Sequence, residues 1–78
     1  MQPWRALTPS AQTLIDPDSG ARGFIRDTQA GAAKRFHWYV IPLGRYHPIA
    51  EGHTGELARA RSVAEAALRA YADDCLAR

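Results

Sequence analysis

Apolar and polar side chains alternate along residues 35–49, a pattern typical of β-strands that have one buried face. A turn is predicted at residues 41–45, because Pro42 presets the first turn position and Gly44 accepts a left-handed backbone. A three-residue loop at this point would pair Val40 with Tyr46, Tyr39 with His47 and His37 with Ile49. The sequence therefore predicts a β-hairpin over residues 35–50.

Alternation sorts the side chains of this hairpin onto two faces. One face is apolar and is expected to join the core. Its side chains are Phe36, Trp38, Val40, Tyr46 and Pro48. The other face mixes cations, imidazoles and a phenol, so it is expected to meet solvent or a partner. Its side chains are Arg35, His37, Tyr39, Ile41, Arg45, His47 and Ile49. Because Pro48 cannot donate a ladder hydrogen bond, its strand is expected at an edge of the sheet.

A helical period follows the hairpin. Apolar side chains recur at intervals of three and four and form one stripe: Leu57, Ala60, Ala64, Leu68, Tyr71 and Cys75. Thr54 is a good N-cap, which predicts a helix over residues 54–76. The capping-box pattern from Ser62 to Glu65 leaves a start at Ser62 as the alternative. The stripe favours the earlier start because it already includes Leu57.

The N-terminal third has weaker patterns. Residues 1–12 contain two prolines and little periodicity, so we expect a flexible arm there, with Trp4 and Leu7 as anchors onto the domain. Short strands are expected at residues 13–15 and 21–27, separated by a turn at residues 16–20. Residues 28–34 are expected to form a loop, with a helical turn as the alternative.

Together these elements predict a single α+β domain over residues 13–78. Its antiparallel sheet would have three strands, or four, and one long C-terminal helix would pack on the face of Phe36, Trp38 and Val40. The opposite face would be open, or covered by the arm or by a second subunit. A chain of 78 residues has a small core, so truncation of Trp38 is expected to unfold it.

Composition limits the classes of function. The single cysteine, Cys75, excludes an intramolecular disulfide and fits a reducing compartment. No apolar run approaches the roughly 18 residues of a spanning helix, and no signal-peptide pattern begins the chain, so we expect a cytoplasmic protein without a membrane partner. Nine of the ten basic residues are arginine, which suits phosphate and planar groups. The many alanines indicate a GC-rich bacterial genome as the alternative explanation for the arginines.

The outer face of the hairpin is the candidate nucleic-acid-binding site. Its cations and rings are Arg35, His37, Tyr39, Arg45 and His47. Arginine binds phosphate or a guanine edge, and tyrosine stacks on bases. Arg22 and Arg26 would join them if the preceding strand presents both on the same side. An ordinary solvated face is one alternative, and a surface for homodimerisation or for a protein partner is the other.

Other chemistries have weaker signals. His37 and His47 could meet across the hairpin, with His53 nearby, but a structural zinc site needs four ligands and usually thiolates. No metal or cofactor is therefore expected. No nucleophile, base and orienting group stand at a recognisable spacing, so no enzymatic activity is expected. Gly52 to Gly55 could hold an anion at a helix start, although a capped turn explains the same residues.

The order of three strands and one helix resembles the small DNA-binding domains at the N-terminus of phage-type integrases and the similar AP2 domains. The likeness covers roughly residues 21–72 and is carried by Trp38, Tyr39, Val40, Gly44, Gly52, Ala60, Ala64 and Leu68. In that family the sheet face opposite the helix reads the major groove, which would imply Arg35, His37, Tyr39, Arg45 and His47 here. The helix also resembles the last helix of double-stranded-RNA-binding domains, and the whole pattern is similar to small bacterial or phage-derived proteins of unknown function.

Overall fold

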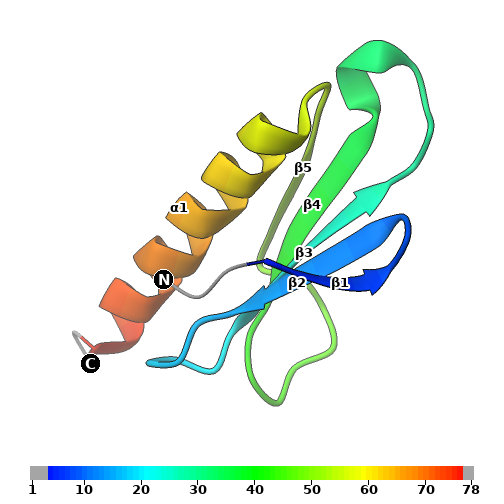
Figure 1. The fold of residues 1–78 in the computed structure, drawn as a ribbon. Helices are drawn as coiled ribbons and strands as arrows, with labels where there is room; N and C mark the ends of the chain where they lie inside the picture. Colours follow the sequence, from blue (N-terminus) through cyan, green and yellow to red (C-terminus); the bar gives the residue numbers. More distant parts are fainter. Residues whose placement is uncertain (1–3, 77–78) are drawn as a thin grey trace.

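The computed structural model, which describes residues 4–76, has an antiparallel sheet and one C-terminal helix (Figure 1). Its elements are β1 (Arg5–Thr8), β2 (Ala11–Ile15), β3 (Arg22–Asp27), the short 3₁₀ turn η1 (Ala32–Lys34), β4 (Phe36–Ile41), β5 (Ala50–Thr54) and α1 (Leu57–Leu76). The strands lie side by side in chain order, β1-β2-β3-β4-β5. The predicted α+β class is confirmed, with five strands in place of three or four.

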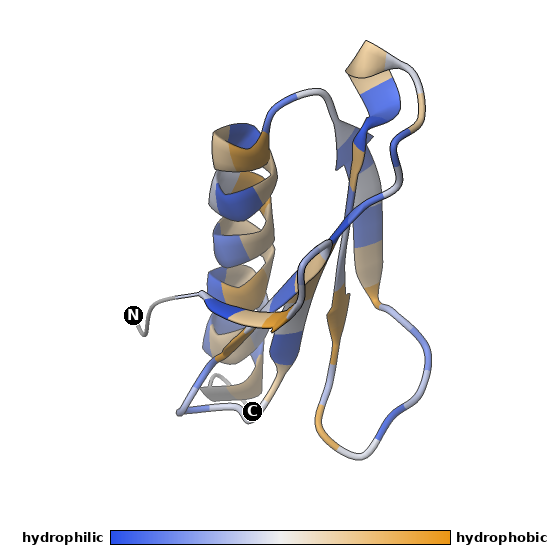
Figure 2. Cartoon of the chain, turned by 45° about the vertical axis from the view of Figure 1, so that its right-hand side comes forward, coloured by the Kyte–Doolittle hydropathy of each residue, from blue (hydrophilic) through white to orange (hydrophobic). Residues whose placement is uncertain are grey.

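The helix α1 lies on one side of the sheet and packs over β3, β4 and β5 (Figures 1 and 2). Three of its side chains, Ala60, Ala64 and Leu68, are fully buried, as the apolar stripe predicts. They face a sheet surface whose buried side chains include Leu14, Ile25 and Val40. Partly buried Trp4, Trp38, Ala67 and Tyr71 surround this core. The predicted packing of the helix on the Trp38 and Val40 face is therefore confirmed.

Two glycines leave room for large side chains on the covered face of the sheet. A Cβ atom at Gly23 would lie 3.0 Å from Cδ1 of Leu68, and one at Gly52 would lie 2.9 Å from Nε1 of Trp38. These separations are shorter than ordinary van der Waals contact. The indole of Trp38 thus occupies the space that a side chain at position 52 would need.

The predicted register of the last hairpin is wrong. A turn forms as expected, with φ of +78° at Gly44 and a 3.1 Å hydrogen bond from Arg45 N to Pro42 O. Residues 42–49 nevertheless form a long loop, and β5 begins only at Ala50, which pairs with Val40. Pro48 explains the difference, because it cannot donate to a ladder. Tyr46, expected in the core, is 91% exposed in that loop.

The prediction for the N-terminal residues also differs from the structure. Residues 5–8 form β1, an edge strand of the sheet, where a flexible arm over residues 1–12 was predicted. Trp4 packs on the core as an anchor, but Leu7 is 57% exposed and does not. A short segment without periodicity can become a strand when a neighbouring strand has a free edge. The free edge of β2 is not visible in the local sequence of residues 5–8.

The remaining predictions differ in detail. The turn at residues 16–20 is confirmed, with Oδ2 of Asp16 accepting hydrogen bonds from Ser19 N at 3.0 Å and Ser19 Oγ at 2.6 Å. α1 begins at Leu57, because Thr54 is still paired in β5. Cys75 is exposed and does not fill the core.

Across residues 4–76, no helix has the length and apolar character needed to cross a membrane.

Candidate nucleic-acid interface

The face of the sheet opposite α1, called here the outer face, is organised in three cross-strand rows. The strand register places Ile15, Arg22 and Ile41 in the first row. The second row contains Arg5, Thr13, Phe24, Tyr39 and Glu51. The third row contains Ala11, Arg26, His37 and His53. Side chains that are far apart in the sequence therefore lie side by side on one surface.

Four rings contact one another across this surface, as two stacked pairs that a tilted contact joins. The ring centroids of Phe24 and Tyr39 are 5.1 Å apart, with an interplanar angle of 16°. His37 lies 5.0 Å from Tyr39 along the same strand, and 4.6 Å from His53 on the neighbouring strand, with 14° between the two imidazole planes. Stacked arrangements at these separations are favourable. We call these four side chains the ring column; it runs diagonally over β3, β4 and β5.

Arginines flank the ring column. Cζ of Arg22 lies 5.8 Å from the centroid of Phe24, in reach of a cation–π interaction. Arg26 is paired in register with His37, and Arg5 reaches the same face from β1. None of the three makes an ion pair with another residue in the range 4–76. Glu51 is the carboxylate that the rows contribute, so the outer face carries more positive than negative charge.

His37 is a half-buried member of the ring column. Its Nε2 atom is buried and has no hydrogen-bond partner among the described residues. Burial is the main cause that lowers the pKa of His37 below its ordinary value of 6.5, and the nearby His53 lowers it further. Glu51 opposes them in part, and Arg26 adds the smallest lowering effect. The imidazole is therefore neutral at neutral pH, which lets it stack on His53 without repulsion.

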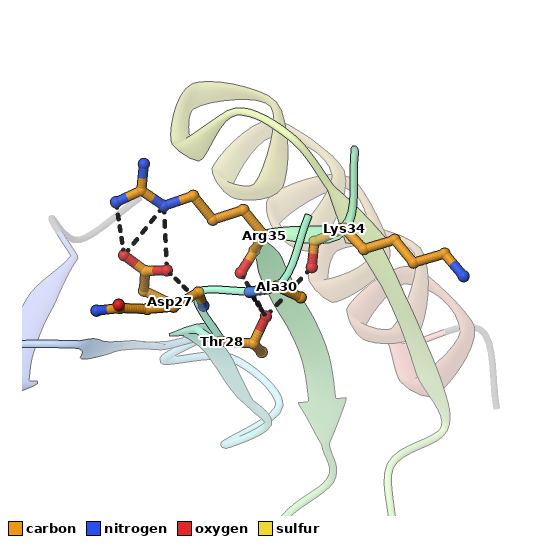
Figure 3. Close-up of polar contacts among 6 residues, drawn as sticks. Asp27, Thr28, Ala30, Lys34 and Arg35 are labelled. Carbon is orange, nitrogen blue, oxygen red and sulfur yellow. Dashed lines mark hydrogen bonds and ion pairs between the residues drawn. The ribbon is translucent and has the colours of Figure 1, made fainter. Parts of the chain in front are cut away.

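Of the predicted site residues, the structure brings together His37 and Tyr39. Arg35 lies elsewhere: its Nη2 is 2.9 Å from Oδ2 of Asp27, and its Nε is 3.1 Å and 3.2 Å from the two carboxylate oxygens (Figure 3). This pairing lowers the pKa of Asp27. Arg45 and His47 are exposed in the 42–49 loop, away from the rows.

Sequence reasoning missed several members of the outer face. Arg22 and Arg26 were expected there only on a condition, and the β3–β4 register now satisfies it. Phe24, between them, was available from the same alternation. His53 would have followed from starting the last strand after Pro48, since Glu51 and His53 then face one way and Gly52 the other. No local sequence pattern around Arg5 predicted that it would lie on the outer face.

A hollow of about 340 Å³ opens on the outer face beside the ring column. Its lining residues are Arg5, Ala6, Leu7, Thr13, Ile15, Arg22 and Phe24. It thus combines two guanidinium groups with an apolar wall. No group of three or more histidine, cysteine, aspartate or glutamate side chains gathers as metal ligands in the part of the chain that the structure describes.

Compared with known protein families, curated proteins and solved structures, the chain has no match. The chemistry of the outer face is therefore the basis for assigning a function.

Proposed function

We propose that this protein binds nucleic acid through the outer face of its sheet. The observation that carries the proposal is the ring column of Phe24, Tyr39, His37 and His53 beside three arginines without ion-pair partners in residues 4–76. Rings offer planar surfaces and edges to bases, and guanidinium groups bind phosphate oxygens. Alternating rings and cations on one sheet face provide both kinds of contact along a strand of nucleic acid.

The distribution of charge supports the same surface. Asp27 lies on the covered side of β3, in register with Phe36, and its charge is paired with Arg35. The outer face keeps Arg5, Arg22 and Arg26 for a ligand. Unpaired cations lose no internal partner when they bind phosphates, so their full electrostatic attraction is available.

The resemblance noted from the sequence supports the proposal as well. Residues 21–72 contain β3, β4, β5 and most of α1. The integrase-type DNA-binding domains that this stretch resembles use the sheet face opposite the helix, which corresponds to the outer face here. The proposed role is that of a binding module without enzymatic activity.

A second candidate function is self-association through the same face. Leu7 is 57% exposed and Ile15 is 43% exposed, and both line the hollow. Apolar side chains exposed together favour a protein interface. Rings and arginines are also enriched at protein interfaces, so the two functions compete for one surface.

The test is an amide-shift titration of the labelled protein with a DNA duplex, a DNA single strand and an RNA hairpin, each at low and moderate salt. Binding through the outer face should shift amides of β3 and β4 and weaken as salt rises. Arg26→Gln should reduce the slope of log affinity against log salt by about 0.7–0.9, since one phosphate contact is lost. Arg69→Gln, which removes an equal charge from the exposed side of α1, is the matched control and should leave the slope unchanged.

Two results would contradict the proposal. One is the absence of shifts with all three nucleic acids together with line widths that already report a dimer, which would favour self-association. The other is equal loss of affinity in Arg26→Gln and Arg69→Gln, which would indicate attraction to net charge and no role for the outer face.

A further inference from the structure

We infer that the hollow beside Phe24 holds one unpaired nucleotide, with its phosphate between Arg5 and Arg22 and its base against the apolar wall. The inference rests on the proposed function and deepens it, because it makes single-stranded nucleic acid the ligand class. The hollow lies on the outer face, where β1, β2 and β3 contribute to it.

The chemistry of the lining divides into two parts. Arg5 and Arg22 supply guanidinium groups, which bind phosphate oxygens with paired N–H donors. Phe24, Leu7 and Ile15 supply ring and aliphatic surface, which suits the planar base. The volume of about 340 Å³ falls at the small end of ligand pockets, as expected for a site that takes one nucleotide unit.

The strand register explains why these groups converge. Arg5 is opposite Thr13, and Thr13 is opposite Phe24, so all three belong to one row. Arg22 lies in the neighbouring row, opposite Ile15, with its guanidinium over the Phe24 ring at 5.8 Å. The two arginines therefore border the hollow from β1 and from β3, and a phosphate between them would contact both.

Thr13 does not compete with the ligand for these donors. Its hydroxyl is buried and donates a hydrogen bond of 2.9 Å to the carbonyl oxygen of Gly23. Arg5 and Arg22 make no ion pair within residues 4–76. The floor of the hollow is thus satisfied internally, while its cations are free to bind an anion.

The position of the hollow sets the kind of nucleic acid. Phe24 ends the ring column on this side: it lines the hollow and is stacked on Tyr39. A strand could place one base in the hollow and continue over the rings of β4 and β5. Bases in a duplex are paired and stacked inside the helix and cannot enter a hollow on a sheet, whereas unpaired bases can turn outward.

The first experiment compares an oligothymidylate of about eight nucleotides with a blunt duplex of equal length. The single strand should bind at least tenfold more tightly. Replacing both Arg5 and Arg22 by Gln should lower the salt slope for the single strand by about 0.7, because the one phosphate that lies between them loses its contacts. Phe24→Leu should weaken binding roughly tenfold. The control, Arg69→Gln, should retain the original slope and affinity.

A second arm uses thymidine 5′-monophosphate, thymidine and inorganic phosphate as separate probes of the labelled protein. The nucleotide should shift amides around Arg5, Thr13 and Phe24 saturably, and neither fragment alone should match it. An amide spectrum of each variant verifies that it is folded. If Phe24→Leu is unfolded, the pair Arg5→Gln and Arg22→Gln still provides the test.

The outcomes separate this inference from the proposed function. A duplex that binds as tightly as the single strand, with shifts at Arg26 and His37 and none at the hollow, would overturn the inference and leave nucleic-acid binding in place. Shifts at the hollow with inorganic phosphate equal to those with the nucleotide would overturn it in favour of a simple anion site. No binding of any strand would refute both.

Discussion

The two faces of the sheet contrast in the size and chemistry of their side chains. Under α1, the contact is made by small and aliphatic residues: Ala60, Ala64 and Leu68 of the helix are fully buried, as are Leu14 and Val40 of the sheet. On the outer face, four contacting rings and three arginines lie beside one another. The helix α1 lies on the other side of the sheet (Figure 1).

This contrast separates stability from binding. Burial of apolar area drives folding, and the covered face contains most of the fully buried apolar side chains. The outer face keeps large planar groups partly exposed to water. Exposed rings contribute less to folding than buried ones, so stability alone does not explain their position. Substitutions under the helix should therefore unfold the protein, and substitutions on the outer face should change binding while the fold persists.

Leu68→Ala should have the largest effect on stability. Leu68 is fully buried and packs over Gly23, so its truncation leaves a cavity between helix and sheet. The expected loss in free energy of unfolding is about 2–5 kcal/mol, a large share of the total for a small domain. Urea unfolding measures it. Leu43→Ala, at a position that is 70% exposed, is the matched control and should change stability by less than about 0.5 kcal/mol; equal effects at both positions would refute the assigned core.

Gly52→Ala should come next, with a loss of about 1–3 kcal/mol. The new Cβ would lie 2.9 Å from Nε1 of Trp38, so the indole must move and disturb the packing under α1. Thermal melting and the tryptophan fluorescence both report the change.

A double-mutant cycle tests the cause of the Gly52 effect. In a Trp38→Phe background a smaller ring replaces the obstructing indole and the core keeps an aromatic side chain, so Gly52→Ala should cost less there than in the wild type. An undiminished cost would mean that the contact with Trp38 has no role in the effect.

Much of the covered face followed from local patterns. The period of Leu57, Ala60, Ala64 and Leu68 predicted the helix, and alternation around Trp38 and Val40 predicted the surface it covers. Such patterns arise because a helix or strand must bury one side, whatever its partner is. Residues 5–8 had no such periodicity, and only their pairing with β2 makes them a strand.

The outer face was only partly predictable, since it depends on register between strands. His37 and Tyr39 followed from alternation within β4. To predict that they stack on His53 and Phe24, one must know which residues of the neighbouring strands lie opposite β4. Because Pro48 delays the start of β5 to Ala50, the partners on that strand differ from those of the predicted hairpin. Arg35 precedes β4 by one position, and its side chain turns to Asp27 because the β3–β4 loop brings the two together.

The ring column should add a smaller amount to stability. A double-mutant cycle of Phe24→Leu and Tyr39→Leu should give a coupling of about 0.5–1.5 kcal/mol, the usual range for a stacked aromatic pair. Chemical denaturation of the four proteins measures it. A coupling near zero would mean that the rings are held by the sheet alone, and would sharpen the assignment of this face to binding.

The smallest effect concerns pH. Because burial lowers the pKa of folded His37 below 6.5, the unfolded chain takes up a proton there before the folded protein does. Stability contributed by neutral His37 is thus complete above pH 6.5 and is lost as pH falls from that value through the lower folded pKa. Thermal melts between about pH 7.5 and pH 5 should show this decline.

Replacing His37 by Gln should flatten the pH dependence within that window, because no proton is then taken up at position 37. His47→Gln is the matched control, since His47 is exposed in the 42–49 loop and the decline should persist without it. Protonation of Asp27, whose pKa is lowered from 3.8 by Arg35, affects stability only at more acidic pH and does not overlap. If His47→Gln flattens the pH dependence of stability and His37→Gln does not, His37 is not the group whose protonation destabilises the protein in this window.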